Sequence, residues 1–220
     1  MTDTLLSDFE ISLIDMKEAI RSIDATSAAG PDGVTPRILK DYVDELVGPL
    51  EILYRRSIDS GEPLDGMNMA HIALIFKGGQ KSKPSNYRPV ALNNHITKIL
   101  ERLIKSKIVH HLTSQQLYNE TQHGFRLKRS TTTNLVEYYE SILLQLEFNR
   151  AVDSIYLDFS RAFDKCDYNI LLAKLHTLGI QGKVLKWTVG FLTKRKQCVV
   201  VEDKHQSRSW SHLGYHKGPF

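Results

Sequence analysis

Three charged side chains stand where a protein could handle phosphate and a hard cation. Asp158 lies near the C-terminal end of the β-prone run SIYLDF, Lys77 follows the apolar run AHIALIF, and Arg88 lies in a second such run. Mg²⁺ takes oxygen ligands from one or two carboxylates and from substrate phosphates. Lysine offers a phosphate a point charge and arginine a planar fork. The plainer alternatives are a turn-capping aspartate and two solvated surface cations.

The alternation of residues 154–159 predicts a strand with two unlike faces. One face carries Ile155, Leu157 and Phe159, and the other carries Ser154, Tyr156 and Asp158. Because an ionised carboxylate is costly to bury, this register favours an exposed Asp158 on the polar face.

The surrounding elements follow from hydrophobic spacing and from turn residues. A first helix is expected from about residue 9 to 23, with Ser7 or Asp8 as its cap, and Pro31-Asp32-Gly33 marks a turn after it. Asp167 is expected to cap a later helix that Gly179 closes. Further helices are expected at 36–59, 95–112, 132–148 and 183–192, and strands at 70–76, 87–92, 154–159 and 198–202.

Charge is divided unevenly along the 220 residues, although the whole chain carries only +4. Residues 1–66 hold 6 Lys and Arg against 14 Asp and Glu, a net −8, whereas residues 67–130 hold 11 against 2, a net +9. A basic block of this kind attracts polyanions through phosphate contacts and counterion release. The alternative is a solvated basic face that the acidic N-terminal third neutralises.

Composition places the chain among ordinary globular proteins, with 41% apolar and 25% charged residues. No apolar run is long enough to cross a bilayer, and the first residues lack a signal-peptide pattern, so an intracellular location, cytoplasmic or nuclear, is expected. Cys166 and Cys198 form no disulfide framework or zinc pattern.

Five blocks in order carry a resemblance to a known family: SAAGPDGV, IALIFKGGQKSKPSNYRPVALNNHITKILERLI, QHGFRLKRSTTTN, YLDFSRAFDKCDYNILLAKL and GIQGKVLKWTVGFLTKRKQCVVV. The series resembles the reverse transcriptase domain of non-LTR, LINE-type retrotransposons. The resemblance implies an α+β fold with the fingers and the first half of the palm of a right-hand polymerase. An N-terminal helical extension would cover 1–69, the fingers 70–150, and a partial palm 151–220.

The resemblance also implies roles for single residues. Asp158 would bind two catalytic Mg²⁺ ions with the carbonyl of Phe159, and Phe163 would lie under the incoming sugar, unless it is a core phenylalanine. Lys77 and Arg88 would hold the triphosphate of an incoming dNTP. The template-side segment would contain Gln122, Gly124 and Arg126, for which a simple turn before a helix is the alternative. The implied partners are an RNA template and a DNA primer, and no membrane.

Two departures from the family pattern matter for activity. The chain ends at GYHKGPF, with His216 and Lys217 where the family has Pro and Gln of a PQGS block, so the expected double-aspartate strand does not follow. A two-metal site with one carboxylate binds Mg²⁺ poorly, and we therefore expect a truncated domain that is inactive alone. The alternatives are a non-catalytic nucleic-acid-binding relic of a retroelement and a remnant with no selected function.

Overall fold

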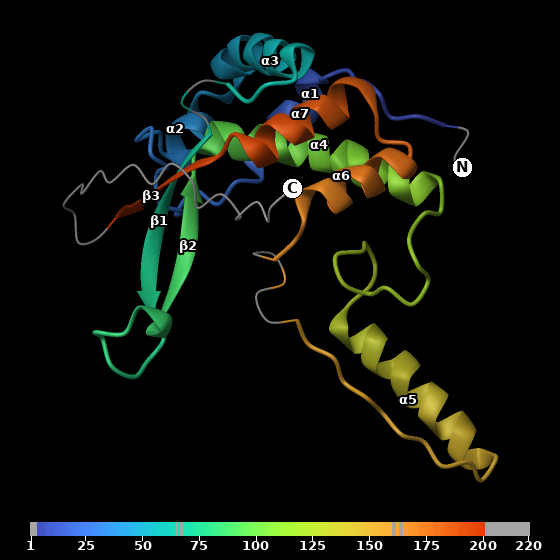
Figure 1. The fold of residues 1–220 in the computed structure, drawn as a ribbon. Coiled ribbons are helices and arrows are strands. Elements are labelled where there is room, and N and C mark those ends of the chain that lie inside the picture. Colours follow the sequence, from blue (N-terminus) through green and yellow to red (C-terminus); the bar gives the residue numbers. More distant parts are fainter. Residues whose placement is uncertain (1–3, 65, 67, 160–161, 163–164, 201–220) are drawn as a thin grey trace.

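The computed structural model describes residues 4–64, 66, 68–159, 162 and 165–200, and its architecture mixes helices with one small sheet (Figure 1). The expected α+β class is confirmed at this level. The helices are α1 (Leu13–Arg21), α2 (Pro36–Asp41), α3 (Val43–Ser60), α4 (His95–Ser114), α5 (Thr131–Glu147), α6 (Tyr168–Thr177) and α7 (Gly182–Thr193). The strands are β1 (Met69–Phe76), β2 (Tyr87–Asn93) and β3 (Lys196–Val200), and a short 3₁₀ turn covers Pro84–Asn86.

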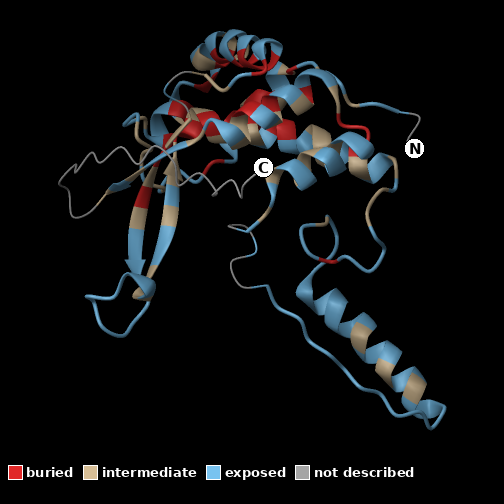
Figure 2. Ribbon diagram, viewed as in Figure 1, coloured by how far each residue is buried: buried red, intermediate tan, exposed pale blue. Residues whose placement is uncertain are grey.

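The hydrophobic core lies within what we call the helical body, α1–α4 with α6 and α7 (Figure 2). Buried apolar side chains come mainly from α1, α3, α4 and α7, so residues from all three expected ranges share one core. Two buried polar groups tie these helices together. The Tyr54 hydroxyl donates to the carbonyl of Ile96 at 2.7 Å, and the Trp187 indole N–H donates to Ser57 Oγ at 2.9 Å.

The sheet has the order β2-β1-β3 and projects from one end of the helical body (Figure 1). β1 pairs antiparallel with β2 and parallel with β3. The first half of β1 is partly buried, with Ala70 and Ile72 fully buried, whereas its last residues are exposed. The strands expected at 70–76 and 87–92 are confirmed, because the basic Gly and Pro segment between them lets β1 and β2 form a hairpin.

The turn at Pro31-Asp32-Gly33 docks on the start of α4. The N–H of Gly33 donates to the carbonyl of Gly30 at 3.0 Å, and Gly33 has a φ of 72°, as the predicted turn requires. Asn94 Oδ1 accepts the N–H of Asp32 at 3.2 Å. The buried His95 bonds the carbonyl of Ala28 at 2.9 Å, so this turn is fastened to the base of the hairpin.

Two helix boundaries differ from the sequence expectation. The first helix begins at Leu13 with Ser12 as its cap, because Ser12 Oγ accepts the N–H groups of Ile14 and Asp15. Asp8, one of the expected caps, instead pairs with Lys183 at 2.8 Å. The single helix expected over 36–59 is divided into α2 and α3 at Tyr42, whose backbone leaves the helical region with φ −113° and ψ 32°.

Farther along the chain, α5 and the returning segment 150–159 form an arm that extends away from the helical body (Figure 1). The expected helix at 132–148 is confirmed, and Ser130 and Thr133 form a reciprocal capping box at its start. No residue of α5 is buried. Apolar spacing therefore predicted the helix correctly, although none of its apolar side chains is buried.

The strand expected at 154–159 is wrong, since residues 151–159 carry no secondary structure. A strand requires a neighbouring backbone for its hydrogen bonds, and within the described residues no strand lies beside this segment. The segment runs back along α5 instead (Figure 1). The later elements agree with expectation: Asp167 caps α6 by accepting two N–H groups, and Gly179 ends that helix with a φ of 86°.

Candidate nucleotide and nucleic-acid site

Lys77 and Arg88 are brought together on one face of the hairpin. Arg88 pairs with Ile75, and the N–H of Lys77 donates to the carbonyl of Asn86 at 2.8 Å, which extends the ladder by one position. Residues opposite one another or two positions apart share a face, so the two cations are diagonal neighbours. Both are exposed, and neither forms an ion pair within the described residues. The pair offers a phosphate two adjacent positive charges.

The hairpin tip adds further order around this pair. The Tyr87 hydroxyl donates to the carbonyl of Lys81 at 3.0 Å, and the Phe76 and Tyr87 rings lie 5.3 Å apart. The Lys81 ammonium lies 6.0 Å from the centroid of the Phe76 ring. These contacts stabilise the conformation of the basic turn that joins β1 and β2.

Asp158 and Phe159 lie on the exposed returning segment of the arm. The Phe159 side chain is 82% exposed, and the Asp158 carboxylate makes no hydrogen bond or ion pair with other described residues. The expectation of an accessible Asp158 agrees with this placement. Asp158 is accessible although its segment forms no strand. The segment contacts α5 through side chains rather than through backbone hydrogen bonds.

Gln122, Gly124 and Arg126 lie together in the loop before α5. The Gln122 side-chain amide donates to the carbonyl of Gly124 at 3.3 Å, and Arg126 donates to the carbonyl of Asn119 at 3.0 Å. The Arg126 guanidinium also lies 5.1 Å from the centre of the Tyr118 ring. Arg126 therefore stabilises the conformation of this loop through contacts with residues of the loop itself.

His123, to which the sequence analysis assigned no role, anchors the same loop to α5. Its side chain is buried, with Nδ1 2.8 Å from Thr133 Oγ1 and Nε2 2.7 Å from Glu137 Oε2. Arg129 also pairs with Glu137, at 3.5 Å. Thr133 and Glu137 are one helical turn apart, and this i, i+4 spacing beside a histidine-containing loop was the only sequence signal available.

The candidate residues form two groups rather than one site. The hairpin that carries Lys77 and Arg88 and the arm that carries Asp158 extend from the helical body in different directions (Figure 1). The loop with Gln122, Gly124 and Arg126 belongs with the arm, because it leads directly into α5. Phe163 lies outside the described residues. The described residues contain no cluster of three or more Asp, Glu, His or Cys side chains that could hold a metal ion.

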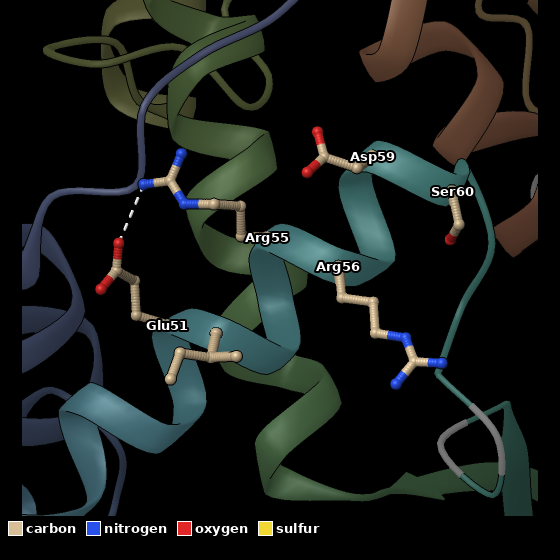
Figure 3. Close-up of a pocket in the computed structure, with 6 residues that line it drawn as sticks. Glu51, Arg55, Arg56, Asp59 and Ser60 are labelled. Atoms are coloured by element: carbon tan, nitrogen blue, oxygen red, sulfur yellow. Dashed lines mark hydrogen bonds and ion pairs between the residues drawn. The ribbon is translucent and has the colours of Figure 1, made fainter.

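A groove of about 460 Å³ runs along α3, and none of these candidate residues lines it (Figure 3). The Arg55 guanidinium is turned toward Glu51, with which it pairs at 2.8 Å, and Asp59 pairs with Lys183 of α7 at 2.6 Å. The residues that line the groove include two acidic and two basic side chains, so their charges sum to zero and the groove has no basic character that would favour a phosphate. The hairpin and the arm therefore remain the candidate sites.

Within the described residues, no helix is both long and apolar enough to cross a membrane. A small sheet with a basic hairpin, a helical body and an exposed aspartate define a candidate nucleotide-handling domain. The reverse transcriptase (RNA-dependent DNA polymerase) family matches residues 77–215, more than half of the chain. The chain belongs to this family, and the resemblance found in the sequence motifs is confirmed.

Relatives from fly mobile elements support the same assignment. The chain is 27% identical over 212 residues to the RNA-directed DNA polymerase from mobile element jockey of Drosophila funebris. The aligned region covers 94% of the chain and 23% of the relative. It is 26% identical over 169 residues to a probable RNA-directed DNA polymerase from transposon BS of Drosophila melanogaster, 76% of the chain and 19% of the relative. A third relative, from the X-element of the same fly, is 36% identical over 95 residues, 43% of the chain and 10% of the relative. The chain thus spans about a fifth of the length of the first two relatives.

Proposed function

We propose that this chain is a portion of an RNA-directed DNA polymerase of a non-LTR retrotransposon, with the hairpin region as its fingers. Residues 70–150 would form the fingers, residues 151–220 part of the palm, and residues 1–69 a helical extension. The observation that carries the proposal is the position of Lys77 and Arg88 as diagonal neighbours on one exposed face of the hairpin. Family membership supports it, since the matched range begins at Lys77 and includes every candidate residue.

Lys77 and Arg88 would hold the triphosphate of an incoming dNTP. A triphosphate carries several negative charges, and two adjacent cations that are not neutralised by carboxylates attract it more strongly than separate surface charges do. Arginine adds two parallel hydrogen bonds to a phosphate, whereas lysine contributes a point charge. The exposed hairpin leaves room for a ligand of this size on the face that both residues share.

Asp158 and the carbonyl of Phe159 would be ligands for Mg²⁺. The donor set fits part of such a site, because Mg²⁺ commonly takes one or two carboxylates and completes its shell with waters and substrate phosphates. When bound, the ion would activate a primer hydroxyl and stabilise the leaving pyrophosphate. The Asp158 carboxylate is accessible and has no described partner to displace, although a single carboxylate implies weak binding.

The loop with Gln122, Gly124 and Arg126 would contact the RNA template beside the primer. Its nearby cations, Lys128 and Arg129, belong to the basic block and suit a phosphate backbone. Because Arg126 bonds carbonyls of its own loop, its proposed contribution is to fix the loop shape rather than to reach the template as a free cation. Phe163 would lie under the incoming sugar.

Catalysis by the 220-residue chain alone is not expected. Asp158 and the hairpin cations lie on separate projections, and the described residues provide no second group of metal-binding carboxylates. We expect no extension of a DNA primer on an RNA template with dNTPs and Mg²⁺. Extension that Asp158→Ala abolished would contradict the prediction of inactivity while supporting the role of Asp158.

Binding of a fluorescent dNTP analogue tests the proposal without requiring catalysis. Replacing both hairpin cations, Lys77→Gln with Arg88→Gln, should weaken binding by about tenfold or more, since each charge-assisted contact contributes roughly 1.5–3 kcal/mol. The matched control is Lys105→Gln, which removes an exposed cation from α4. Equal losses in the hairpin variant and the control would show that the chain binds the analogue by general charge and would overturn the hairpin assignment.

A further inference from the structure

The loop before α5 contains a short stretch, 124–129, that is attached to this helix at both of its ends. At one end, His123 Nδ1 lies 2.8 Å from Thr133 Oγ1, and its Nε2 lies 2.7 Å from Glu137 Oε2. At the other end, Ser130 Oγ accepts the N–H of Thr133 at 3.1 Å as the cap of the helix. The stretch is therefore closed onto the first two turns of α5.

His123 supplies the buried end of this closure. Within 115–130, a range that the structure describes throughout, it is the only buried residue. A carboxylate oxygen only accepts hydrogen bonds, so Nε2 carries the hydrogen that is donated to Glu137, while Nδ1 faces the Thr133 hydroxyl. Both ring nitrogens are used on α5, and any part that His123 takes in binding is therefore indirect.

Two neighbouring cations, Lys128 and Arg129, lie in the closed stretch. Lys128 is exposed, and its backbone has a φ of 60°. A residue other than glycine adopts this left-handed conformation only at a cost, which the contacts around it must offset. The Arg129 guanidinium lies 3.5 Å from the same Glu137 oxygen that His123 bonds. One carboxylate of α5 therefore orients both the histidine and one of the cations.

We propose that His123 is a positioning residue that directs Lys128 and Arg129 toward the phosphates of a single-stranded RNA, an inference that rests on the proposed role of this loop in template binding. Cations on a backbone that is fixed at both ends lose little conformational freedom when they bind a phosphate. Without the imidazole the stretch is attached at Ser130 alone. The cations remain in the chain, but their phosphate contacts form at a larger entropic cost.

Fluorescence anisotropy of a labelled single-stranded RNA, measured over a series of salt concentrations, tests the inference on the full chain. His123→Ala should weaken RNA binding about threefold to tenfold. The slope of log affinity against log salt should also become shallower by about 0.7 for each phosphate contact that is lost. Partial unfolding would lower the apparent affinity but leave this slope unchanged, because the molecules that stay folded keep every contact.

Two further variants make the test specific to the His123 ring. His123→Gln keeps a side-chain amide that can replace one of the two hydrogen bonds, so its affinity should lie between those of His123→Ala and the wild type. The matched control is His110→Ala, which removes an exposed histidine from α4 and should bind RNA like the wild type. Equal losses in His110→Ala and His123→Ala would overturn the positioning role.

A double variant, Lys128→Gln with Arg129→Gln, separates failure of this inference from failure of the proposed template role. If the double variant weakens RNA binding and makes the salt slope shallower while His123→Ala matches the wild type, the positioning role is overturned and the template role survives. If the double variant also binds like the wild type, the template role itself is overturned. A loss of affinity in His123→Ala without a change in slope would show that His123 supports only folding.

Discussion

The helical body and the arm contain helices of similar sequence pattern but of very different burial. α4 and α5 both carry apolar residues at helical spacing, and α4 buries residues such as Ile99, Leu100 and Leu103 whereas α5 buries none (Figure 2). A periodic pattern therefore predicts the helix in both regions but not its surroundings. Burial depends on partners distant in sequence, and only the body has them among the described residues.

The sharpest test of this difference compares one substitution in both regions. Leu100→Ala removes a fully buried side chain of the core and should lower the free energy of unfolding by about 2–5 kcal/mol. Leu143→Ala in α5 removes a side chain that is 61% exposed, and it should change stability by about 0.5 kcal/mol or less. Urea denaturation followed by circular dichroism measures both. Similar losses would mean that the arm packs in solution.

Helix caps give a smaller contrast between the same regions. Ser12→Ala removes the cap of α1 in the body, and Ser130→Ala removes half of the capping box of α5 in the arm. Each should cost about 1 kcal/mol. We expect the first to lower global stability and the second to increase amide hydrogen exchange within α5 alone, because the arm opens without unfolding the core. Exchange that spread from Ser130→Ala into α4 would contradict an independent arm.

The smallest expected effect concerns a carboxylate at the edge of the body. Burial raises the pKa of Glu101 on α4, whereas Arg195 and Lys98 oppose the shift, and one carboxylate oxygen has no hydrogen-bond partner among the described residues. The folded protein therefore binds this proton more tightly than the unfolded chain. Stability from this group is present below its unfolded-chain pKa and is lost as pH rises through the folded pKa.

Glu101→Gln should accordingly raise stability at neutral pH and flatten the fall in stability from acid to neutral conditions. Urea denaturation at a series of pH values measures this effect, with Glu120→Gln in the exposed loop before α5 as the control. A variant less stable than the wild type at neutral pH would show that Arg195 stabilises the Glu101 carboxylate by more than its burial costs.

Much of the fold follows from local signals in the sequence. The hairpin, the turn at Gly33, the Asp167 cap of α6 and the glycine end of α6 depend on residues within a few positions of each other. The Ser12 cap and the break at Tyr42 were not predicted, and the segment that precedes α1 is held by another helix. Leu6 and Ser7, for example, bond the start of α7.

The candidate site divides in the same way. Hairpin register alone brings Lys77 and Arg88 together, and the loop residues Gln122, Gly124 and Arg126 are close in sequence. The strand expected around Asp158 failed, because strand formation requires a neighbouring backbone that alternation cannot supply. His123 is buried only because its loop packs against α5, where Thr133 and Glu137 bond its imidazole ring.

The sequence by itself determined the family, most of the helices and the basic hairpin. Tertiary structure decided which apolar faces are buried, that residues 151–159 lie along α5 without forming a strand, and that the hairpin and the arm stand apart. The physical reason is that propensity, capping and turn chemistry act between neighbours in the chain. Burial and β pairing instead require surfaces that only the folded chain brings into contact.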